Sequence, residues 1–178
     1  MPDINGNAKA TKKKQIDLID SRIIRMLQVD GRLSNTEIGK HLDLSEATVR
    51  SRIKRLIDED FVQIVAVSNP FKLGFEIAGD LYIHVEMKKI DAVLEALKEF
   101  KELWYIILTT GNTHINAEFV AKSLEELHDL VYNQISKIDG VIKIEISVIM
   151  KYVKRKYDYG TALDEEPFYA VKNHLKEI

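Results

Sequence analysis

The chain has 178 residues, of which 46% are hydrophobic and 30% are charged, a composition typical of a folded globular protein rather than a disordered one. It contains no Cys, which excludes disulfide scaffolds, cysteine-ligated metal centres and thiol catalysis. The net charge of −2 argues against a uniformly basic protein, but residues 1–60 carry 12 Lys and Arg against 10 Asp and Glu. Positive charge is therefore concentrated at the N-terminal end.

No apolar run reaches the roughly 20 residues needed to cross a bilayer, and the N-terminus lacks the apolar core of a secretory signal. We therefore expect a cytoplasmic protein with no membrane partner. Residues 1–15 show no apolar periodicity and end in a run of three Lys, which predicts a flexible basic tail.

Three helices are predicted within residues 16–58. Apolar residues at 16, 19, 23, 26 and 27 form one helical stripe, and Gly31 supplies a left-handed stop. Ser34 and Glu37 have the spacing of a capping box at the start of a second, short helix. Ser45 is a good N-cap for a third helix, whose buried side holds Val49, Ile53, Leu56 and Ile57.

The short turn between the second and third helices predicts a helix-turn-helix. Residues 61–67 are rich in β-branched side chains and predict a strand that forms a wing beside the helices. The sequence thus predicts a winged helix-turn-helix domain over residues 16–66 and a linker over residues 67–76.

Beyond residue 77 strands and helices alternate. Strand-like alternation at residues 81–87, 104–110, 115–119 and 141–150 is interrupted by helical spacing at 93–100 and 124–138. This β-α-β-β-α-β order predicts a ferredoxin-like domain over residues 77–153, with helices on one face of a four-stranded antiparallel sheet, so the fold class is α+β. We expect another protein surface to cover the open face, predicted to carry Tyr82, His84, Glu86, Ile107, Thr109, His114, Asn116, Glu118, Lys143, Glu145, Ser147 and Ile149.

Residues 154–178 form a C-terminal extension that begins with basic residues. Pro167 can start a helix whose apolar side, used for packing rather than for ligand contact, holds Phe168, Val171, Leu175 and Ile178.

A run of motifs between residues 17 and 62 resembles a known family. It consists of Asp20, Ile23, Ile24, Leu27, Asp30-Gly31-Arg32-Leu33-Ser34, Glu37, Ile38, Leu44, Ser45, Val49, Arg52, Ile53 and Leu56. This pattern resembles the N-terminal signature of the Lrp/AsnC transcription regulators, and the block that follows resembles their ligand-sensing, oligomerising domain. The resemblance covers residues 16–153. It implies a regulator that binds DNA pseudo-palindromes as a homodimer, often assembled into an octamer, and that is tuned by a small molecule, frequently an amino acid.

The chain departs from the family pattern at two kinds of position. Asp43 and Asp60 stand where the family usually has Gly, and Asp tolerates positive φ, so both turns are retained. Where the family commonly reads Gly-Asp-x-Asp, the chain has Gly111-Asn112-Thr113-His114. A carboxylate that would hold a ligand ammonium is absent there, so the expected effector is an amino acid or a related metabolite whose ammonium this loop does not bind.

The third helix carries the candidate DNA contacts. Its face opposite the apolar stripe has the geometry to enter a major groove. There Arg50 can bind guanine bidentately, and Ser or Thr48 can contact a base edge or a phosphate. Arg52 and Arg55 flank that face and are placed for phosphates. The alternative is a solvated basic helix face, and residues 12–14 are likewise either a phosphate-touching arm or a solubility tail. The full candidate set is Ser34, Ser45, Glu46, Ala47, Thr48, Arg50, Ser51, Arg52, Lys54 and Arg55.

The hairpin between the second and third sheet strands holds the candidate effector contacts, against the alternative of a plain hairpin at a subunit contact. His84 and His114 share the open face of the sheet, but two His without a third ligand fall short of a metal site. We therefore expect no metal and no cofactor. The candidate effector contacts are Thr109, Thr110, Gly111, Asn112, Thr113 and His114.

Two other functions share this layout. Siroheme decarboxylases have the same two domains with an altered helix-turn-helix, whereas the one here is intact. A sensing module that acts through protein contacts would leave the basic face of the third helix without a purpose. The sequence has no phosphate-cradling Gly loop, nucleophile elbow or helix with paired metal-ligating His, so no enzyme is predicted.

Overall fold

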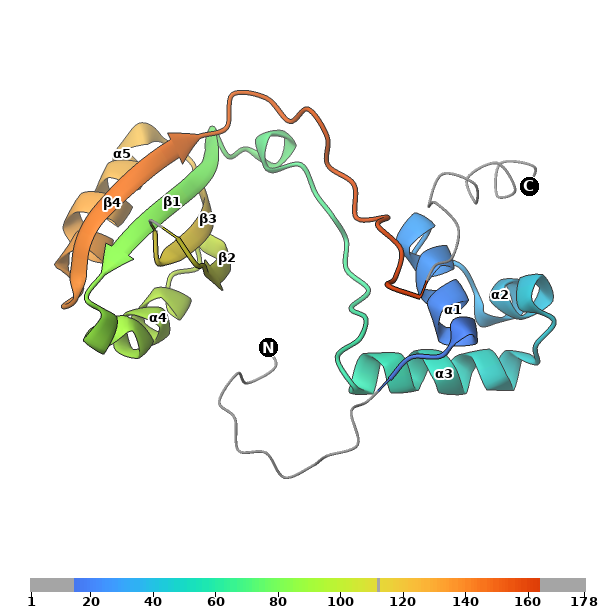
Figure 1. Cartoon of the computed structure of the whole chain (residues 1–178). Coiled ribbons are helices and arrows are strands. Elements are labelled where there is room, and N and C mark those ends of the chain that lie inside the picture. The colour runs from blue at the N-terminus through green and yellow to red at the C-terminus, as the bar shows by residue number, and fades with distance from the viewer. Residues whose placement is uncertain (1–14, 112, 164–178) are drawn as a thin grey trace. The chain divides into compact units, whose positions relative to one another are not determined.

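The computed structural model describes residues 15–111 and 113–163, and it divides into two compact units (Figure 1). One unit, here called the helical unit, contains the described residues up to Ala66 and from Lys154 onward. The other, the sheet unit, is Val67–Val153. The chain therefore passes twice between the units, once after Ala66 and once after Val153.

The helical unit is built from α1 (Leu18–Val29), α2 (Asn35–Leu42) and α3 (Glu46–Asp58). Each helix contributes apolar side chains to one core, in which Ile23, Ile38, Val49 and Leu56 are fully buried. The amphipathic stripes in the sequence predicted this arrangement, because a helix with one apolar face is stable only where that face is buried. The helix-turn-helix prediction is confirmed.

Local side-chain chemistry sets the helix ends. The capping box predicted for α2 is formed, with the Ser34 hydroxyl accepting from the Glu37 amide and the Glu37 carboxylate accepting from the Ser34 amide at 2.8 Å. Asp43, the C-cap of α2, adopts the left-handed conformation (φ 55°), as does Asp60 after α3 (φ 60°). Both Asp residues therefore serve in turns that favour Gly.

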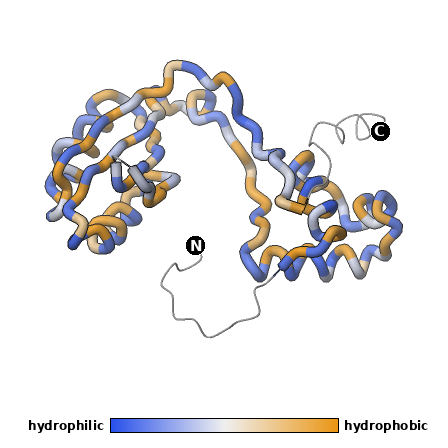
Figure 2. The backbone as a smooth tube through the Cα atoms, in the orientation of Figure 1, coloured by the Kyte–Doolittle hydropathy of each residue, from blue (hydrophilic) through white to orange (hydrophobic). Residues whose placement is uncertain are grey.

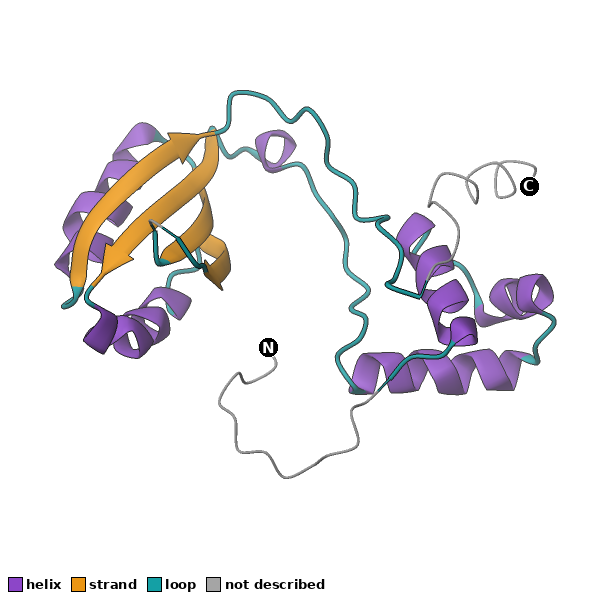
Figure 3. Cartoon of the chain, viewed as in Figure 1, coloured by secondary structure: helices purple, strands orange, loops and turns teal. Residues whose placement is uncertain are grey.

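The predicted wing is not formed. Residues 62–68, largely hydrophobic in Figure 2, have no strand partner, and Figure 3 shows them as loop. The β-branched residues there favour extended backbone, but a strand needs a second strand to satisfy its N–H and C=O groups. Because the helical unit offers no such strand among its described residues, the winged part of the fold prediction is wrong.

The sheet unit has the predicted β-α-β-β-α-β order. Its elements are β1 (Ile77–Val85), α4 (Ile90–Lys98), β2 (Leu103–Leu108), β3 (Ile115–Ala121), α5 (Leu124–His128) and β4 (Val141–Val148). Short 3-10 turns precede β1 (η1, Pro70–Leu73) and α4 (η2, Met87–Lys89), while α5 continues as a π-helical segment (η3, Asp129–Gln134) and a 3-10 turn (η4, Ile135–Lys137). The antiparallel strands lie in the order β2-β3-β1-β4, which confirms the ferredoxin-like prediction.

The sheet buries one face under its helices. The helices lie along one side of the strands (Figure 3). Leu81 and Ile83 of β1 and Ala117 and Phe119 of β3 are fully buried in a core that they share with side chains of α4, α5 and η4. The alternate residues of β1 and β3 lie on the other face, where they are only half-buried. The strands thus show the predicted alternation, and no helix of the chain covers the second face among the described residues.

The C-terminal segment returns to α1. The Gly160 amide donates to the Gln28 side chain at 2.9 Å, the Gln28 amide donates to the Gly160 carbonyl at 3.3 Å, and the hydroxyls of Ser21 and Thr161 lie 2.6 Å apart. The described part of the extension, residues 154–163, therefore belongs to the helical unit, which the sequence did not predict. The helix predicted from Pro167 onward lies outside the described residues, as do residues 1–14. None of the described helices has the length and apolar character to span a bilayer.

Candidate nucleic-acid interface

One face of α3 is exposed along the whole helix. Val49 and Leu56 are fully buried, whereas the six predicted contacts on the opposite side are exposed, namely Glu46, Ala47, Thr48, Arg50, Ser51 and Lys54. Ser45 is also exposed, and its hydroxyl accepts from the Thr48 amide at 3.1 Å as the N-cap. Ser34 caps α2 and is likewise exposed. The structure therefore brings eight of the ten predicted DNA contacts to the surface.

The cations of this exposed face make only exposed ion pairs. Arg50 pairs with Glu46 one turn earlier, and Lys54 pairs with Asp58 at 2.6 Å. Ion pairs of this kind contribute little to stability, because water screens both charges. Arg50 and Lys54 can therefore exchange these partners for a DNA base or phosphate at small cost.

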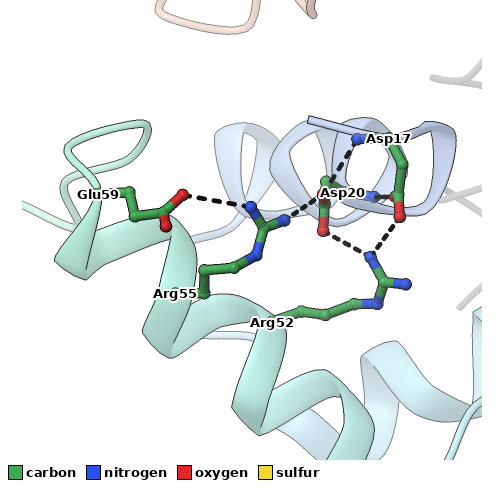
Figure 4. Close-up of polar contacts among 5 residues, drawn as sticks. All are labelled: Asp17, Asp20, Arg52, Arg55 and Glu59. Atoms are coloured by element: carbon green, nitrogen blue, oxygen red, sulfur yellow. Dashed lines mark hydrogen bonds and ion pairs between the residues drawn. The ribbon is translucent and has the colours of Figure 1, made fainter. Parts of the chain in front are cut away.

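Arg52 and Arg55 are placed differently from the other predicted contacts (Figure 4). Arg52 donates from Nη1 to Asp17 at 2.7 Å and to Asp20 at 2.8 Å. Arg55 pairs with the other oxygen of Asp20 and with Glu59 at 3.3 Å. Both guanidinium groups are thus bound to acidic side chains. These acids lie at the N-cap of α1 (Asp17), within α1 (Asp20) and at the C-cap of α3 (Glu59).

Electrostatics reinforces this network. Asp20 is only 1% exposed, so its carboxylate is stable there only because two guanidinium groups bind it. Hydrogen bonds that Arg52 donates to Asp17 and Asp20 raise the pKa of Arg52, and the bond that Arg55 donates to Asp20 raises the pKa of Arg55. Burial acts to raise the pKa of Asp17, but hydrogen bonds from the Asp20 amide and Arg52 outweigh it and lower the pKa.

Sequence reasoning missed Asp17 and Asp20 as members of this site. The two acids form a capping box at the start of α1, with the Asp20 amide donating to Asp17 at 2.8 Å. A usable signal was present, because Asp20 falls at helical spacing from the apolar residues Ile16, Ile23 and Leu27 and so belongs to the buried side. A buried carboxylate requires a cation, and Arg52 and Arg55 have the matching three-residue spacing on α3.

The same residues border a cavity on the exposed side of α3. Its lining includes the acids Asp17 and Asp20 and both guanidinium groups, with Gln15, Ala47, Thr48 and Ser51 completing it. The cavity therefore joins the ion-pair network to the predicted DNA-contacting face.

The predicted effector contacts lie in the β2–β3 hairpin of the sheet unit. The Thr109 hydroxyl donates to the Thr113 carbonyl at 2.7 Å, and the Thr109 amide donates to the His114 carbonyl at 2.8 Å. Thr110 and Gly111 form the exposed tip, while Asn112 lies outside the described residues. The hairpin thus brings the described candidates together without a carboxylate among them.

His84 and His114 are neighbours on the open face, as predicted, with ring centroids 6.2 Å apart. His114 Nδ1 accepts from the Val85 amide at 3.1 Å, and His84 Nε2 lies 3.3 Å from a Glu145 carboxylate oxygen. The described residues contain no group of three side chains arranged to hold a metal ion.

A helix-turn-helix with an exposed reading helix, joined to a ferredoxin-like domain with an open hairpin, defines a DNA-binding regulator with a sensory domain. Residues 16–57 match the AsnC-type helix-turn-helix domain, and residues 81–159 match the Lrp/AsnC ligand binding domain. The chain belongs to the Lrp/AsnC family of transcriptional regulators.

Relatives support this assignment over nearly their full lengths. An uncharacterized HTH-type transcriptional regulator of Pyrococcus horikoshii is 35% identical over 148 residues, which is 83% of this chain and 94% of that protein. The HTH-type transcriptional regulator LrpA of the same organism is 35% identical over 140 residues, 78% of this chain and 99% of that protein. The chain is therefore a transcription regulator and not an enzyme, and the comparisons give no support to the siroheme decarboxylase alternative.

Solved structures show the same fold. The structure of Escherichia coli AsnC has a TM-score of 0.71 at 21% identity and covers 80% of this chain and 97% of that one. A transcriptional regulator of Neisseria meningitidis in complex with L-Met has a TM-score of 0.72 at 20% identity and covers 81% of this chain and 96% of that one. At these identities the likeness concerns the fold alone.

Proposed function

We propose that the chain binds pseudo-palindromic double-stranded DNA as a homo-oligomer, with α3 of each copy in a major groove. The observation that carries this proposal is the exposed face of α3, where Arg50 and Lys54 stand opposite the buried Val49 and Leu56 with only exposed acids as partners. Two such helices related by a two-fold axis enter successive major grooves about 34 Å apart.

Within this proposal the exposed contacts divide into two groups. Arg50 and Ser51 lie at the centre of the exposed face and are assigned to base edges, together with Glu46, Ala47 and Lys54. Ser34, Ser45 and Thr48 lie at helix N-termini, where hydroxyls and amides bind phosphate. Base specificity is therefore expected from the first group and register on the duplex from the second.

The open face of the sheet supports a homodimer as the smallest assembly. Tyr82 and His84 of β1 and Glu118 of β3 are only half-buried there, and no described helix covers them. A second copy of this face, packed against the first, would cover the sheet and remove these side chains from water. Light scattering should therefore give a dimer or a multiple of one, up to an octamer, and a monomer at micromolar concentration would contradict this part.

We further propose that the sheet unit binds a small-molecule effector, an amino acid or a related metabolite, at the β2–β3 hairpin. The match to the Lrp/AsnC ligand binding domain supports the site, and a regulator of the same fold was solved with L-Met. Thr109, Thr113 and His114 offer hydroxyl, carbonyl and imidazole groups there, together with Thr110, Gly111 and Asn112. Without a carboxylate in the hairpin, the ammonium of an amino acid needs another partner.

The DNA proposal is tested by selecting bound fragments from the source genome at two salt concentrations. Specific and phosphate-driven binding separate there, because phosphate contacts lose affinity steeply with salt whereas sequence enrichment survives. We expect an enriched pseudo-palindrome with half-sites about 10 base pairs apart. If no sequence is enriched and no DNA is retained even at low salt, the proposal is wrong, and a module that acts through protein contacts is favoured.

A further inference from the structure

The buried carboxylate of Asp20 is the point where α1 holds α3. Its Oδ1 accepts from Arg52 at 2.8 Å, and its Oδ2 accepts from Arg55 and from the Asp17 amide at 3.0 Å. Every side of the carboxylate thus has a donor. Asp20 is 1% exposed, while Arg52 is 25% exposed and Arg55 is 36% exposed.

Two features of this contact fix the orientation of α3, the helix proposed to enter the major groove. Arg52 and Arg55 stand three residues apart, one turn of α3, so a single carboxylate holds the helix at two successive turns. Arg52 also reaches Asp17 at 2.7 Å, which joins α3 to the first turn of α1. Rotation of α3 about its axis or a slide along it would break at least one of these contacts.

The network lies next to the residues that the proposed function assigns to DNA. Arg50 and Ser51 precede Arg52 directly, and Lys54 precedes Arg55. Thr48 and Ser51 line the same cavity as Asp20 and both guanidinium groups. A small rotation of α3 would therefore displace the base-reading side chains relative to the core of the helical unit.

We propose that Asp20 is a positioning residue, which sets the rotation of α3 through Arg52 and Arg55, and that these two arginines serve DNA recognition through Asp20 rather than as direct phosphate contacts. This inference rests on the proposed DNA-reading role of α3. It replaces the phosphate role that the sequence pattern suggested for Arg52 and Arg55.

The two roles predict changes of opposite sign for Asp20→Asn. If the arginines contact phosphates, removal of the acid that competes for them strengthens binding to every DNA and steepens its salt dependence. If they position α3, the same change weakens binding to the selected operator and leaves affinity for an unrelated duplex the same or slightly higher. Asp58→Asn is the matched control for the exchange measurement, because it also removes one acid from α3 but breaks only an exposed ion pair with Lys54.

The first measurement needs no DNA. Hydrogen exchange of the full-length protein is compared between wild type, Asp20→Asn and Asp58→Asn at neutral pH. We expect Asp20→Asn to lose roughly tenfold or more of the protection of α1 and α3 amides while β1 and β3 are unchanged, because a buried ion pair has lost its shared acid. Unchanged protection in α1 and α3 would overturn the inference, whatever the fate of the DNA proposal.

The second measurement uses the selected operator and an unrelated duplex of equal length, at a temperature where each variant is folded. Arg52→Gln accompanies Asp20→Asn, since it keeps the Arg55 contact to Asp20 and so preserves the fold. We expect the operator-to-unrelated affinity ratio to fall roughly tenfold in both variants with an unchanged salt slope, and to stay constant in Glu95→Gln, which removes an exposed acid of α4 that pairs with Lys98.

Two results would contradict the positioning role. One is a salt slope that falls by about 1 in Arg52→Gln with a uniform loss on both duplexes, the behaviour of a phosphate contact. The other is stronger binding of Asp20→Asn to both duplexes. If wild type itself shows no operator preference, the proposed function fails, and the exchange measurement alone decides whether Asp20 holds α3.

Discussion

The helical unit and the sheet unit satisfy their polar groups in different ways. In the helical unit the charged residue that is fully buried, Asp20, finds both its cations within the same unit. In the sheet unit the apolar core lies on one face only, and the Asn116 oxygen on the other face has no donor among the described residues. The helical unit therefore neutralises its buried carboxylate with its own arginines, whereas the sheet unit leaves one face of its sheet uncovered by the described helices.

This difference matches the division of labour in the proposed function. A DNA-reading helix needs a fixed orientation, and a closed ion-pair network supplies it without outside help. A sensory and oligomerising domain needs a face that remains available to a second copy. The predictions below separate the two units or measure the residues that make each complete, in order of decreasing effect.

Phe119→Ala should destabilise the sheet unit by about 3–5 kcal/mol, because Phe119 is fully buried and its removal leaves a cavity. The single tryptophan, Trp104, belongs to β2, so its fluorescence reports unfolding of this unit. Phe119→Leu is the matched control and should cost less. Hydrogen exchange should show α1–α3 unaffected, and an equal loss in both units would mean that they unfold as one.

Arg50→Ala should weaken operator binding by about 1–3 kcal/mol with the fold intact, because a base-contacting Arg discriminates by this amount. The loss should concentrate at one base position when the operator is varied. Lys101→Ala in the sheet unit removes the same charge from an exposed site and should leave the affinity unchanged. If Arg50→Ala keeps full operator affinity, the proposal that the exposed face of α3 contacts base edges is wrong.

Gln28→Ala should destabilise the helical unit by about 1 kcal/mol, because it removes two hydrogen bonds that hold Gly160 against α1. Thermal unfolding followed by far-UV circular dichroism measures the loss, and the exposed Gln63→Ala is its control. If both variants unfold alike, the C-terminal segment contributes nothing to the helical unit.

The pH dependence of stability should differ between the two units, because each contains one carboxylate with a shifted pKa. Burial raises the pKa of Asp80 above 3.8, so its ionised form destabilises the folded sheet unit, and Asp80→Asn should stabilise it at neutral pH. That gain should shrink as pH falls through the raised pKa and vanish below 3.8, where the carboxyl is protonated in both the folded and the unfolded state. Asp17 has a lowered pKa, so Asp17→Asn should destabilise the helical unit at neutral pH, with the difference vanishing only below 3.8. Urea unfolding at several pH values tests both signs.

Features with a local cause were predictable from the sequence. The Ser34–Glu37 capping box depends on residues three apart, and the order of strands and helices in the sheet unit follows from periodicities of two and 3.6. The exposed face of α3 followed in the same way from the spacing of Val49 and Leu56. Most of the fold and the position of the reading face were therefore within reach of the sequence.

Features that depend on distant partners were not. The stretch of residues 61–67 has strand-like composition, but composition does not say whether a second strand is present, and here none is paired with it. Asp20 meets Arg52 across 32 residues and Gln28 meets Gly160 across 132, and neither contact leaves a local pattern. The sequence therefore predicts that Arg52 and Arg55 are surface cations that contact phosphates, although the acid that binds them is buried.

The smallest effect concerns Asp60, which adopts φ 60°, a left-handed conformation that favours Gly. Asp60→Gly removes the steric cost of the left-handed conformation but adds freedom to the unfolded chain, so the net gain should be only about 0.5 kcal/mol. Asp60→Ala lacks the short polar side chain that tolerates this conformation and should cost about 1 kcal/mol. Urea unfolding of both variants should therefore bracket wild type. If Gly and Ala shift stability in the same direction, backbone strain does not govern this turn, and the end of α3 is set instead by Arg55 and Glu59.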